Sequence, residues 1–305
     1  MVVWLKPSFE NETGATGENT HSLAESVTDL VQNDRMIPSS SSPQGVGPAS
    51  APNAWSERLA AYRWERQAIG RSRATVFRLV ASGRPDLFVK AEPSGIFCEI
   101  IGEAARLRWL VTLGVAGPEV LGLEASAGWH WLLMTAVPGI DLASRHDLLP
   151  TETIDLAVSA LKMLHAYPVE GCPFDHRLAR RLALARSRLS AGLIDPRNFG
   201  DEYLGRSPEE LMEDLLANRP GGADLVLAHG DACLPNFMAK GSAFAGFIDC
   251  ARLGIADRYQ DLALAGWSIG HNLGVDWVEP FYRAYGLTDP DRQKLQFYRT
   301  LDEFF

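Results

Sequence analysis

A polar loop between two apolar runs constrains this 305-residue chain more than any other feature. The loop, residues 229–236, has the sequence HGDACLPN, and Asp249 follows the apolar run 244–248, which is typical of a strand. An isolated His-Gly-Asp is most often a turn whose aspartate caps a helix. Here the loop aspartate, Asp231, is joined by Asn236 five residues later and by Asp249 after the strand. The combination indicates one site that uses three oxygen-bearing side chains together.

These residue types suit phosphoryl transfer from a nucleotide. That reaction needs a carboxylate to accept the hydroxyl proton and oxygen ligands for the Mg²⁺ that accompanies the phosphates. Asp231 is the candidate base, and Asn236 and Asp249 are the candidate ligands of Mg²⁺. Protein kinases use a similar loop, His-Arg-Asp with an asparagine five residues on, whereas this chain has Gly230 at the arginine position. The pattern predicts a kinase that uses a nucleotide and Mg²⁺.

The segment upstream of this loop supplies the other parts of a kinase site. Residues 75–80 and 87–90 read as two strands joined by a turn containing Gly and Pro, and Lys90 ends the second strand. Residues 96–113 have a helical pattern that includes Glu103. Either charge alone would be read as solvated. Together with the loop, they predict that Lys90 contacts the nucleotide phosphates and that Glu103 steadies Lys90. Residues 70–73 form either a phosphate-facing loop or an ordinary one.

The order of elements predicts an α+β chain with a protein-kinase-like, two-lobed fold. Strands and one helix come first, and the apolar run 131–137 leads into Pro138-Gly139. Helical patterns then follow at 154–165, 177–191, 209–217, 258–271, 277–285 and 292–304. We therefore expect a small β-rich, nucleotide-binding N-lobe at 53–137 and a larger helical C-lobe at 138–305 that holds the catalytic and acceptor sites. Residues 1–52, rich in Ser, Pro, Gly, Asn and Thr, are expected to be a disordered N-terminal extension.

Composition and charge limit the classes of molecule that the protein is expected to bind. A net charge of -9 argues against nucleic acid and is compatible with a cationic small-molecule substrate. No apolar run is long enough for a membrane span, and no protein partner is implied. The four cysteines form no C-x-x-C pair, which disfavours a zinc site and is typical of reduced thiols, so we expect a cytoplasmic protein.

From about Asn53 to Phe305 the chain resembles the bacterial aminoglycoside O-phosphotransferases, most closely the type II kanamycin/neomycin 3′-phosphotransferase group. The resemblance lies in these blocks: VFRL (76–79), GRP (83–85), LFVK (87–90), EAARL (103–107), CPFDH (172–176), HGDACLPN (229–236), GFIDC (246–250), ADRYQD (256–261) and LDEFF (301–305).

The resemblance implies the same roles for the five residues above and adds others. It implies that the backbone of Thr135 and Val137 faces the adenine, that Ser72 lies in the loop over the phosphates, and that Arg252 braces the catalytic loop. Asp257 and Asp261 are instead expected to stabilise the start of the helix that follows them, because carboxylates there satisfy free N–H groups.

The resemblance also implies an acceptor site made of carboxylates, because aminoglycosides carry several ammonium groups. The matching residues are Asp195, Asp201, Glu202, Asp302, Glu303 and the terminal carboxylate of Phe305. The chain departs from the type II pattern twice, with Trp267-Ser268 in place of an Arg-Asp pair and with Pro196, Arg197, Asn198 and Gly200 in a segment that is otherwise more acidic. Trp267 would either stack on a sugar ring or fill a helix interface.

The sequence therefore predicts an ATP-dependent phosphotransferase that acts on the 3′-hydroxyl of an aminoglycoside antibiotic and gives kanamycin/neomycin-type resistance. One alternative is a kinase of another small hydroxyl compound on the same fold, which the lost acids motivate. The other is a nucleotide-binding protein without transfer activity.

Overall fold

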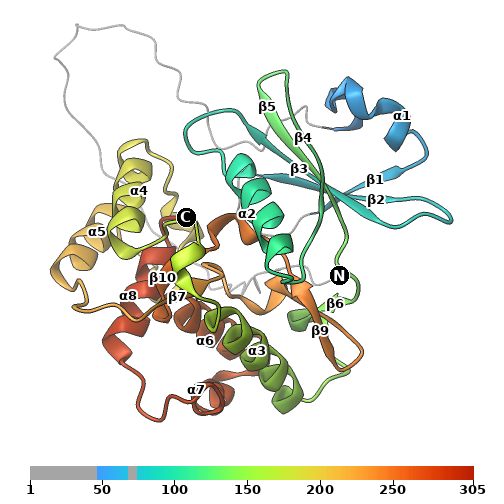
Figure 1. Cartoon of the computed structure of the whole chain (residues 1–305). Helices are drawn as coiled ribbons and strands as arrows, with labels where there is room; N and C mark the ends of the chain where they lie inside the picture. Colours follow the sequence, from blue (N-terminus) through green and yellow to red (C-terminus); the bar gives the residue numbers. More distant parts are fainter. Residues whose placement is uncertain (1–46, 68–73) are drawn as a thin grey trace, which may run out of the picture.

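The computed structural model describes residues 47–67 and 74–305 (Figure 1). The extension expected at 1–52 therefore lies outside the described residues as far as residue 46, and so does Ser72. Residues 47–52 are described and contain a short 3₁₀ turn, Pro48–Ser50, after which Ala51 packs against the core of the first lobe.

The first lobe is built on a five-stranded antiparallel sheet with the order β1-β2-β3-β5-β4. Successive side chains of a strand point to opposite faces of the sheet. On β2, Phe77 and Leu79 are buried on one face, whereas Arg78 between them is exposed on the other. The strand β3 continues past the predicted end at Lys90, because Ala91 and Glu92 stay paired with β5. The strands are β1 (Arg63–Gln67), β2 (Thr75–Val80), β3 (Leu87–Pro93), β4 (Val120–Ser126) and β5 (Trp129–Thr135).

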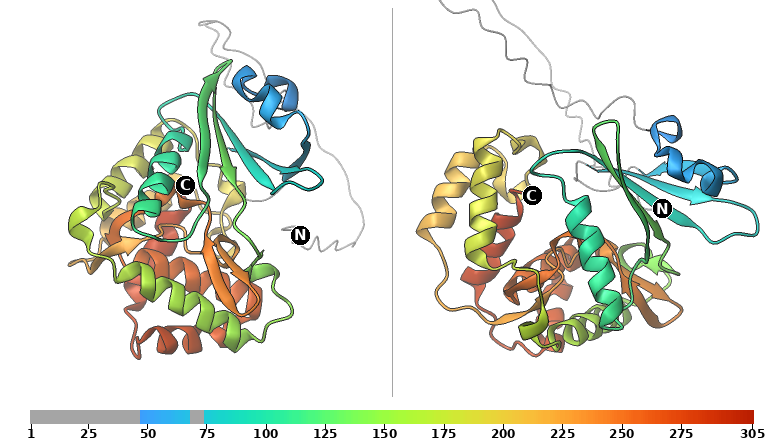
Figure 2. Two further views of the ribbon diagram at one scale, coloured as in Figure 1. Left: turned by 45° about the vertical axis from the view of Figure 1, so that its right-hand side comes forward. Right: turned by 45° about the horizontal axis from the view of Figure 1, so that its top comes forward.

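A short helix, α1 (Ser56–Leu59), precedes the sheet, and a longer one, α2 (Ile100–Thr112), lies between the sheet and the second lobe (Figure 1). The helix α2 begins four residues later than predicted. The carboxylate of Glu92, on β3, accepts hydrogen bonds from the backbone N–H groups of Glu99 and Ile100 and so satisfies free donors at the start of α2. Two further views show the same position of α2 (Figure 2).

The second lobe is mainly helical, as predicted, with boundaries within a few residues of the expected ones. Its helices are α3 (Pro150–His165), α4 (Leu178–Ser190), α5 (Pro208–Ala217), α6 (Tyr259–Leu273), α7 (Val278–Tyr285) and α8 (Arg292–Asp302). Two small antiparallel sheets accompany them, one of β6 (Ile140–Asp141), β8 (Phe237–Lys240) and β9 (Ala243–Phe247), the other of β7 (Leu225–Ala228) and β10 (Gly254–Asp257). In the described part of the chain, none of the helices combines the length and hydrophobicity needed to cross a membrane.

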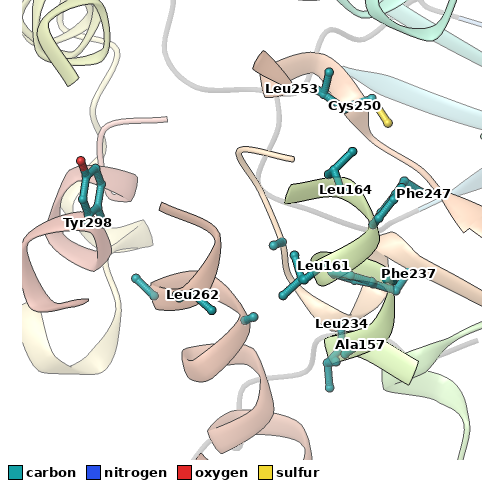
Figure 3. Close-up of a cluster of buried hydrophobic side chains, with 14 of the residues drawn as sticks. Ala157, Leu161, Leu164, Leu234, Phe237, Phe247, Cys250, Leu253, Leu262 and Tyr298 are labelled. Carbon is teal, nitrogen blue, oxygen red and sulfur yellow. The ribbon is translucent and has the colours of Figure 1, made fainter. Parts of the chain in front are cut away.

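One buried cluster continues from the second lobe into the first. Leu107 on α2 and Leu132 on β5 belong to the same cluster as the helices of the second lobe. Side chains of α3 lie beside the loop and strands that carry the predicted site (Figure 3), with Ala157, Leu161 and Leu164 next to Leu234, Phe237 and Phe247. The loop and strands of the predicted site therefore pack against close-packed apolar side chains, which resist displacement.

Candidate active site

The predicted catalytic loop leaves β7 and ends in a 3₁₀ turn, Leu234–Asn236, directly before β8. Gly230 adopts a left-handed φ of +83°, and a Cβ there would lie 2.2 Å from the carbonyl oxygen of Arg252. This contact leaves no space for the arginine that protein kinases have at the position. The segment after Asp249 therefore packs directly on the loop, with the backbone of Arg252 against Gly230.

Asp261 holds this loop from α6. Its buried carboxylate accepts hydrogen bonds from the backbone N–H of His229 at 2.7 Å and of Gly230 at 2.8 Å, and it lies 2.9 Å from Nε2 of His165. The prediction that Asp261 stabilises the start of its own helix is wrong. Asp257 alone has that role, and it accepts from the N–H of Tyr259 at 3.0 Å.

The contacts of Asp261 also set its charge. Burial would raise the pKa of Asp261, but the interactions with His165 and with the loop N–H groups hold the pKa below the ordinary aspartate value. The carboxylate is thus ionised, and it orders a loop that would otherwise carry unpaired N–H groups.

Asp231 stands at the centre of the loop with its backbone fixed. Its carbonyl oxygen accepts from Nδ2 of Asn236 at 2.8 Å and from the N–H of Cys233 at 2.9 Å. Burial raises the pKa of Asp231 above the ordinary value, and nearby Asp302 and Asp249 add to the rise, whereas Arg252 opposes it. A carboxylate with a raised pKa accepts a proton more readily than an ordinary aspartate.

Asn236 and Asp249 lie next to each other, although thirteen positions separate them in the sequence. The N–H of Ile248 donates to the carbonyl oxygen of Asn236 at 3.0 Å. Asp249 has a left-handed φ of +57°, which is costly for a residue with a side chain and often occurs at functional sites. Because the amide nitrogen of Asn236 is committed to Asp231, its oxygen is available as a ligand. Mg²⁺ prefers oxygen ligands and keeps several of its water molecules when bound. The amide oxygen of Asn236 and the carboxylate of Asp249, which is 42% exposed and so accessible to water, fit this preference.

Lys90 joins both lobes at this point. Its Nζ lies 2.8 and 2.9 Å from the two carboxylate oxygens of Glu103 on α2 and 2.9 Å from Oδ1 of Asp249. Burial lowers the pKa of Lys90, but the two carboxylates outweigh it and raise the pKa above the usual lysine value. The contact of Lys90 with Glu103 was predicted from the sequence, whereas the contact of Lys90 with Asp249 was not.

Thr135 ends β5, and Val137 follows in the connection between the lobes. The N–H of Thr135 already donates to the carbonyl oxygen of Glu119 at 3.0 Å. A contact of Thr135 with a base would therefore use its carbonyl oxygen.

The six residues predicted for the acceptor lie in two groups. Asp302, Glu303 and Phe305 lie at the end of α8. Nη1 of Arg252 is 3.1 Å from Oδ1 of Asp302, and its guanidinium lies 5.3 Å from the centre of the Phe305 ring. Asp195, Asp201 and Glu202 lie in the segment between α4 and α5, where Asp195 caps a 3₁₀ turn and pairs with Arg197 at 2.7 Å. The segment contacts α8, because the N–H of Gly200 donates to Oε2 of Glu303 at 3.1 Å.

Arginines neutralise most of these carboxylates, which the sequence did not suggest. Arg299 lies 2.5 Å from Oε1 of Glu303 and 3.3 Å from Glu202, and Arg181 lies 3.7 Å from Asp302. The guanidinium of Arg181 also stacks 3.9 Å from the centre of the Phe305 ring, and burial lowers its pKa to about 10. The four-residue spacing of Arg299 and Glu303 on a helix was the one available signal.

Trp267 lies in this arginine-rich region rather than in a purely apolar interface. Its ring stacks on His271, with centroids 5.5 Å apart, and the guanidinium of Arg299 lies 4.6 Å from its centre. Ser268 is buried and accepts a hydrogen bond from the N–H of Leu234 at 2.9 Å. The two residues therefore connect α6 to α8 and to the catalytic loop.

The chain is similar to known proteins over most of its length. Residues 46–298 match the family model described as the phosphotransferase enzyme family. The chain is 34% identical over 251 residues to an aminoglycoside 3′-phosphotransferase of Escherichia coli, a match that covers 81% of this chain and 92% of that protein.

Solved structures show the same likeness. The crystal structure of a type VIII aminoglycoside 3′-phosphotransferase matches with a TM-score of 0.75 and 34% identity, covering 83% of this chain and 97% of the other. An aminoglycoside phosphotransferase of Streptomyces rimosus, solved with ADP and streptomycin, matches with a TM-score of 0.69 and 30% identity, covering 79% and 92%.

Proposed function

From the premise that this chain belongs to the phosphotransferase enzyme family, we propose that it transfers the γ-phosphoryl group of ATP to the 3′-hydroxyl of an aminoglycoside antibiotic. The activity would give kanamycin/neomycin-type resistance. The observation that carries the proposal is the cluster of Asp231, Asn236, Asp249, Lys90 and Glu103, in a chain similar to aminoglycoside 3′-phosphotransferases over most of its length. A cytoplasmic location is part of the proposal, because the donor ATP is a cytoplasmic metabolite.

Each residue has a distinct part in the proposed reaction. Asp231 accepts the proton of the attacking hydroxyl, and its raised pKa suits that role. Lys90 binds the α- and β-phosphates while Glu103 keeps the ammonium group in place. Asn236 and Asp249 would hold Mg²⁺, which neutralises the charge that develops on the phosphates.

The two lobes divide the substrates between them in this proposal. Residues 53–137 bind the nucleotide, with the backbone of Thr135 and Val137 near the adenine, and Ser72 is assigned to the phosphate loop although it lies outside the described residues. Residues 138–305 carry the base and the acceptor site. There, Asp302, Glu303, the terminal carboxylate of Phe305, Asp201, Glu202 and Asp195 would attract ammonium groups.

The acid side of the pH profile tests the assignment of Asp231. Arg252 favours the ionised form of Asp231, so Arg252→Met should raise the pKa of this base further. Because only the ionised base accepts a proton, the acid limb of kcat/KM is expected to move to higher pH in this variant. Asp302→Asn, which removes a negative charge near Asp231, should move the limb to lower pH. Limbs that stay in place in both variants would contradict the assignment.

A second acceptor class is favoured by the arginines of the acceptor region. Glu303 and Asp302 are already paired with Arg299, Arg252 and Arg181, so few negative charges remain for ligand ammonium groups. A less cationic sugar or amino alcohol would need fewer unpaired carboxylates in its binding site. Salt distinguishes the classes, because added salt raises the KM of a polycationic acceptor much more than that of a neutral one.

A panel of acceptors tests the proposed function directly. Release of ADP from Mg-ATP would be measured with kanamycin, neomycin, streptomycin, a 3′-deoxy aminoglycoside, neutral sugars and amino alcohols. Turnover of kanamycin and neomycin without turnover of the 3′-deoxy analogue is the expected result. Turnover of neutral acceptors alone would support the second class, and binding of ATP with no ADP release on any acceptor would indicate a nucleotide-binding protein.

A further inference from the structure

Arg106 on α2 makes a side-chain contact from the first lobe to the second. It lies one turn after Glu103, and its Nε donates to the carbonyl oxygen of Leu253 at 2.5 Å. Its Nη1 donates to the carbonyl oxygen of Gly102 at 3.0 Å, within the same helix. The guanidinium also lies 4.7 Å from the centre of the Phe174 ring. These contacts hold the side chain in one direction, across the boundary between the lobes.

The acceptor of this hydrogen bond belongs to the segment that carries the proposed metal ligand. Leu253 lies four residues after Asp249 and is fully buried. The intervening 3₁₀ turn, Cys250–Arg252, packs against α2. Arg106 therefore ties the helix that carries Glu103 to the segment that carries Asp249, and both of these carboxylates contact Lys90.

The end of α2 has a second attachment to the same region. The carbonyl oxygen of Ala116, four residues after α2, accepts from the N–H of Phe247 on β9 at 3.0 Å. A Cβ at Gly246 would lie 2.9 Å from that oxygen, so the two backbones are in close contact. With two attachments about ten residues apart, α2 is fixed in direction as well as in position.

We propose that Arg106 is a positioning residue that fixes α2 on residues 249–253, so that Glu103 and Asp249 remain within reach of Lys90 without bound nucleotide. The inference rests on the proposed phosphotransferase function. In protein kinases, activity depends on whether the corresponding helix brings its glutamate to the lysine. An arginine is charged at every physiological pH, so its hydrogen bond to the carbonyl oxygen of Leu253 does not depend on pH in that range.

A double-mutant cycle tests whether Arg106 acts through Glu103. Arg106→Met removes the charge and the hydrogen bonds but keeps most of the aliphatic stem. We expect kcat with Mg-ATP to fall by about 2- to 30-fold and the KM for ATP to rise, with an unchanged KM for the acceptor. In a Glu103→Gln background, the same change should have little further effect, because the group that Arg106 positions has already been altered.

Two matched variants make the experiment specific. Arg108→Met introduces the same substitution at an exposed position on the same helix, and it should leave kcat unchanged. Arg106→Lys retains a charged donor and should have a kcat between those of Arg106→Met and the wild type. If Arg106→Met does not fold, Arg106→Lys replaces it in the double-mutant cycle. Equal losses in the wild-type and Glu103→Gln backgrounds, or no loss at all, would overturn the proposal.

The test also separates this inference from the proposed function. If the wild-type protein transferred phosphate to no acceptor in the panel, the binding of Mg-ATP measured by calorimetry would replace kcat in the cycle. Weaker binding in Arg106→Met than in wild type, with no such difference in the Glu103→Gln background, would support the positioning role. Equal binding in Arg106→Met and wild type would exclude it.

Discussion

Replacing Asp231 by asparagine is expected to lower kcat for phosphoryl transfer by about 10²- to 10⁴-fold, the usual contribution of a general base. The amide is almost isosteric, so the backbone contacts of Asp231 with Asn236 and Cys233 should persist. Because the change does not touch Lys90 or Asp249, the affinity for Mg-ATP should change little. Single-turnover kinetics and nucleotide titration on the same preparation would check both expectations.

The control for this variant is Asp201→Asn, which makes the same chemical change at an exposed position. It should keep kcat within a few-fold of the wild-type value and affect only the KM for a cationic acceptor. Normal turnover by Asp231→Asn would show that another group accepts the proton, and the assignment of the base would be wrong.

Replacing Asp261 by asparagine should damage both stability and turnover. The amide can accept only through one oxygen, and its NH₂ group would face N–H donors that now bind a carboxylate. Leaving buried donors unpaired costs about 1–3 kcal/mol each, so the free energy of unfolding should fall by at least that amount. Displacement of the loop by about 1 Å would lower kcat by roughly 10²-fold.

Thermal unfolding and kcat, measured well below the unfolding temperature, test this expectation together. Asp155→Asn, on the exposed side of α3, is the matched control and should alter neither quantity. A variant of Asp261 that is destabilised but turns over normally would contradict the role of Asp261 in positioning the loop, while leaving its structural role intact.

Much of the fold and the main contacts of the candidate site could be predicted from the sequence. The apolar patterns predicted most helices and strands, and the contact of Lys90 with Glu103 was predicted by reading these two charges together with the downstream catalytic loop. The errors arose where distant segments decide the structure. Lys90 lies within β3 rather than at its end, because pairing with β5 extends the strand through residues whose own pattern is weak.

The role of Asp261 could not be predicted for a related reason. An aspartate near the start of a helix normally serves that helix, and only the packing of α6 under the catalytic loop places its carboxylate beside His229. The pairing of Asp302 with Arg181 and Arg252 could not be predicted, because it depends on how α8 contacts α4 and the segment after Asp249. The pairing of Arg299 with Glu303 is local, and their four-residue spacing was the signal that was overlooked.

The contacts of Lys90 have a consequence for how the donor enters. Lys90 has three protons, and Glu103 and Asp249 provide three acceptor oxygens within 2.9 Å, so its donors are saturated before any phosphate arrives. If Asp249 binds a cation, as proposed, its contact with Lys90 must break. The ammonium group of Lys90 then contacts a phosphate instead of Asp249. Both charged groups keep a partner of opposite charge during this change only when the nucleotide and the cation bind together. ATP stripped of its divalent cation would meet an uncompensated carboxylate, so the enzyme should discriminate against it at the binding step.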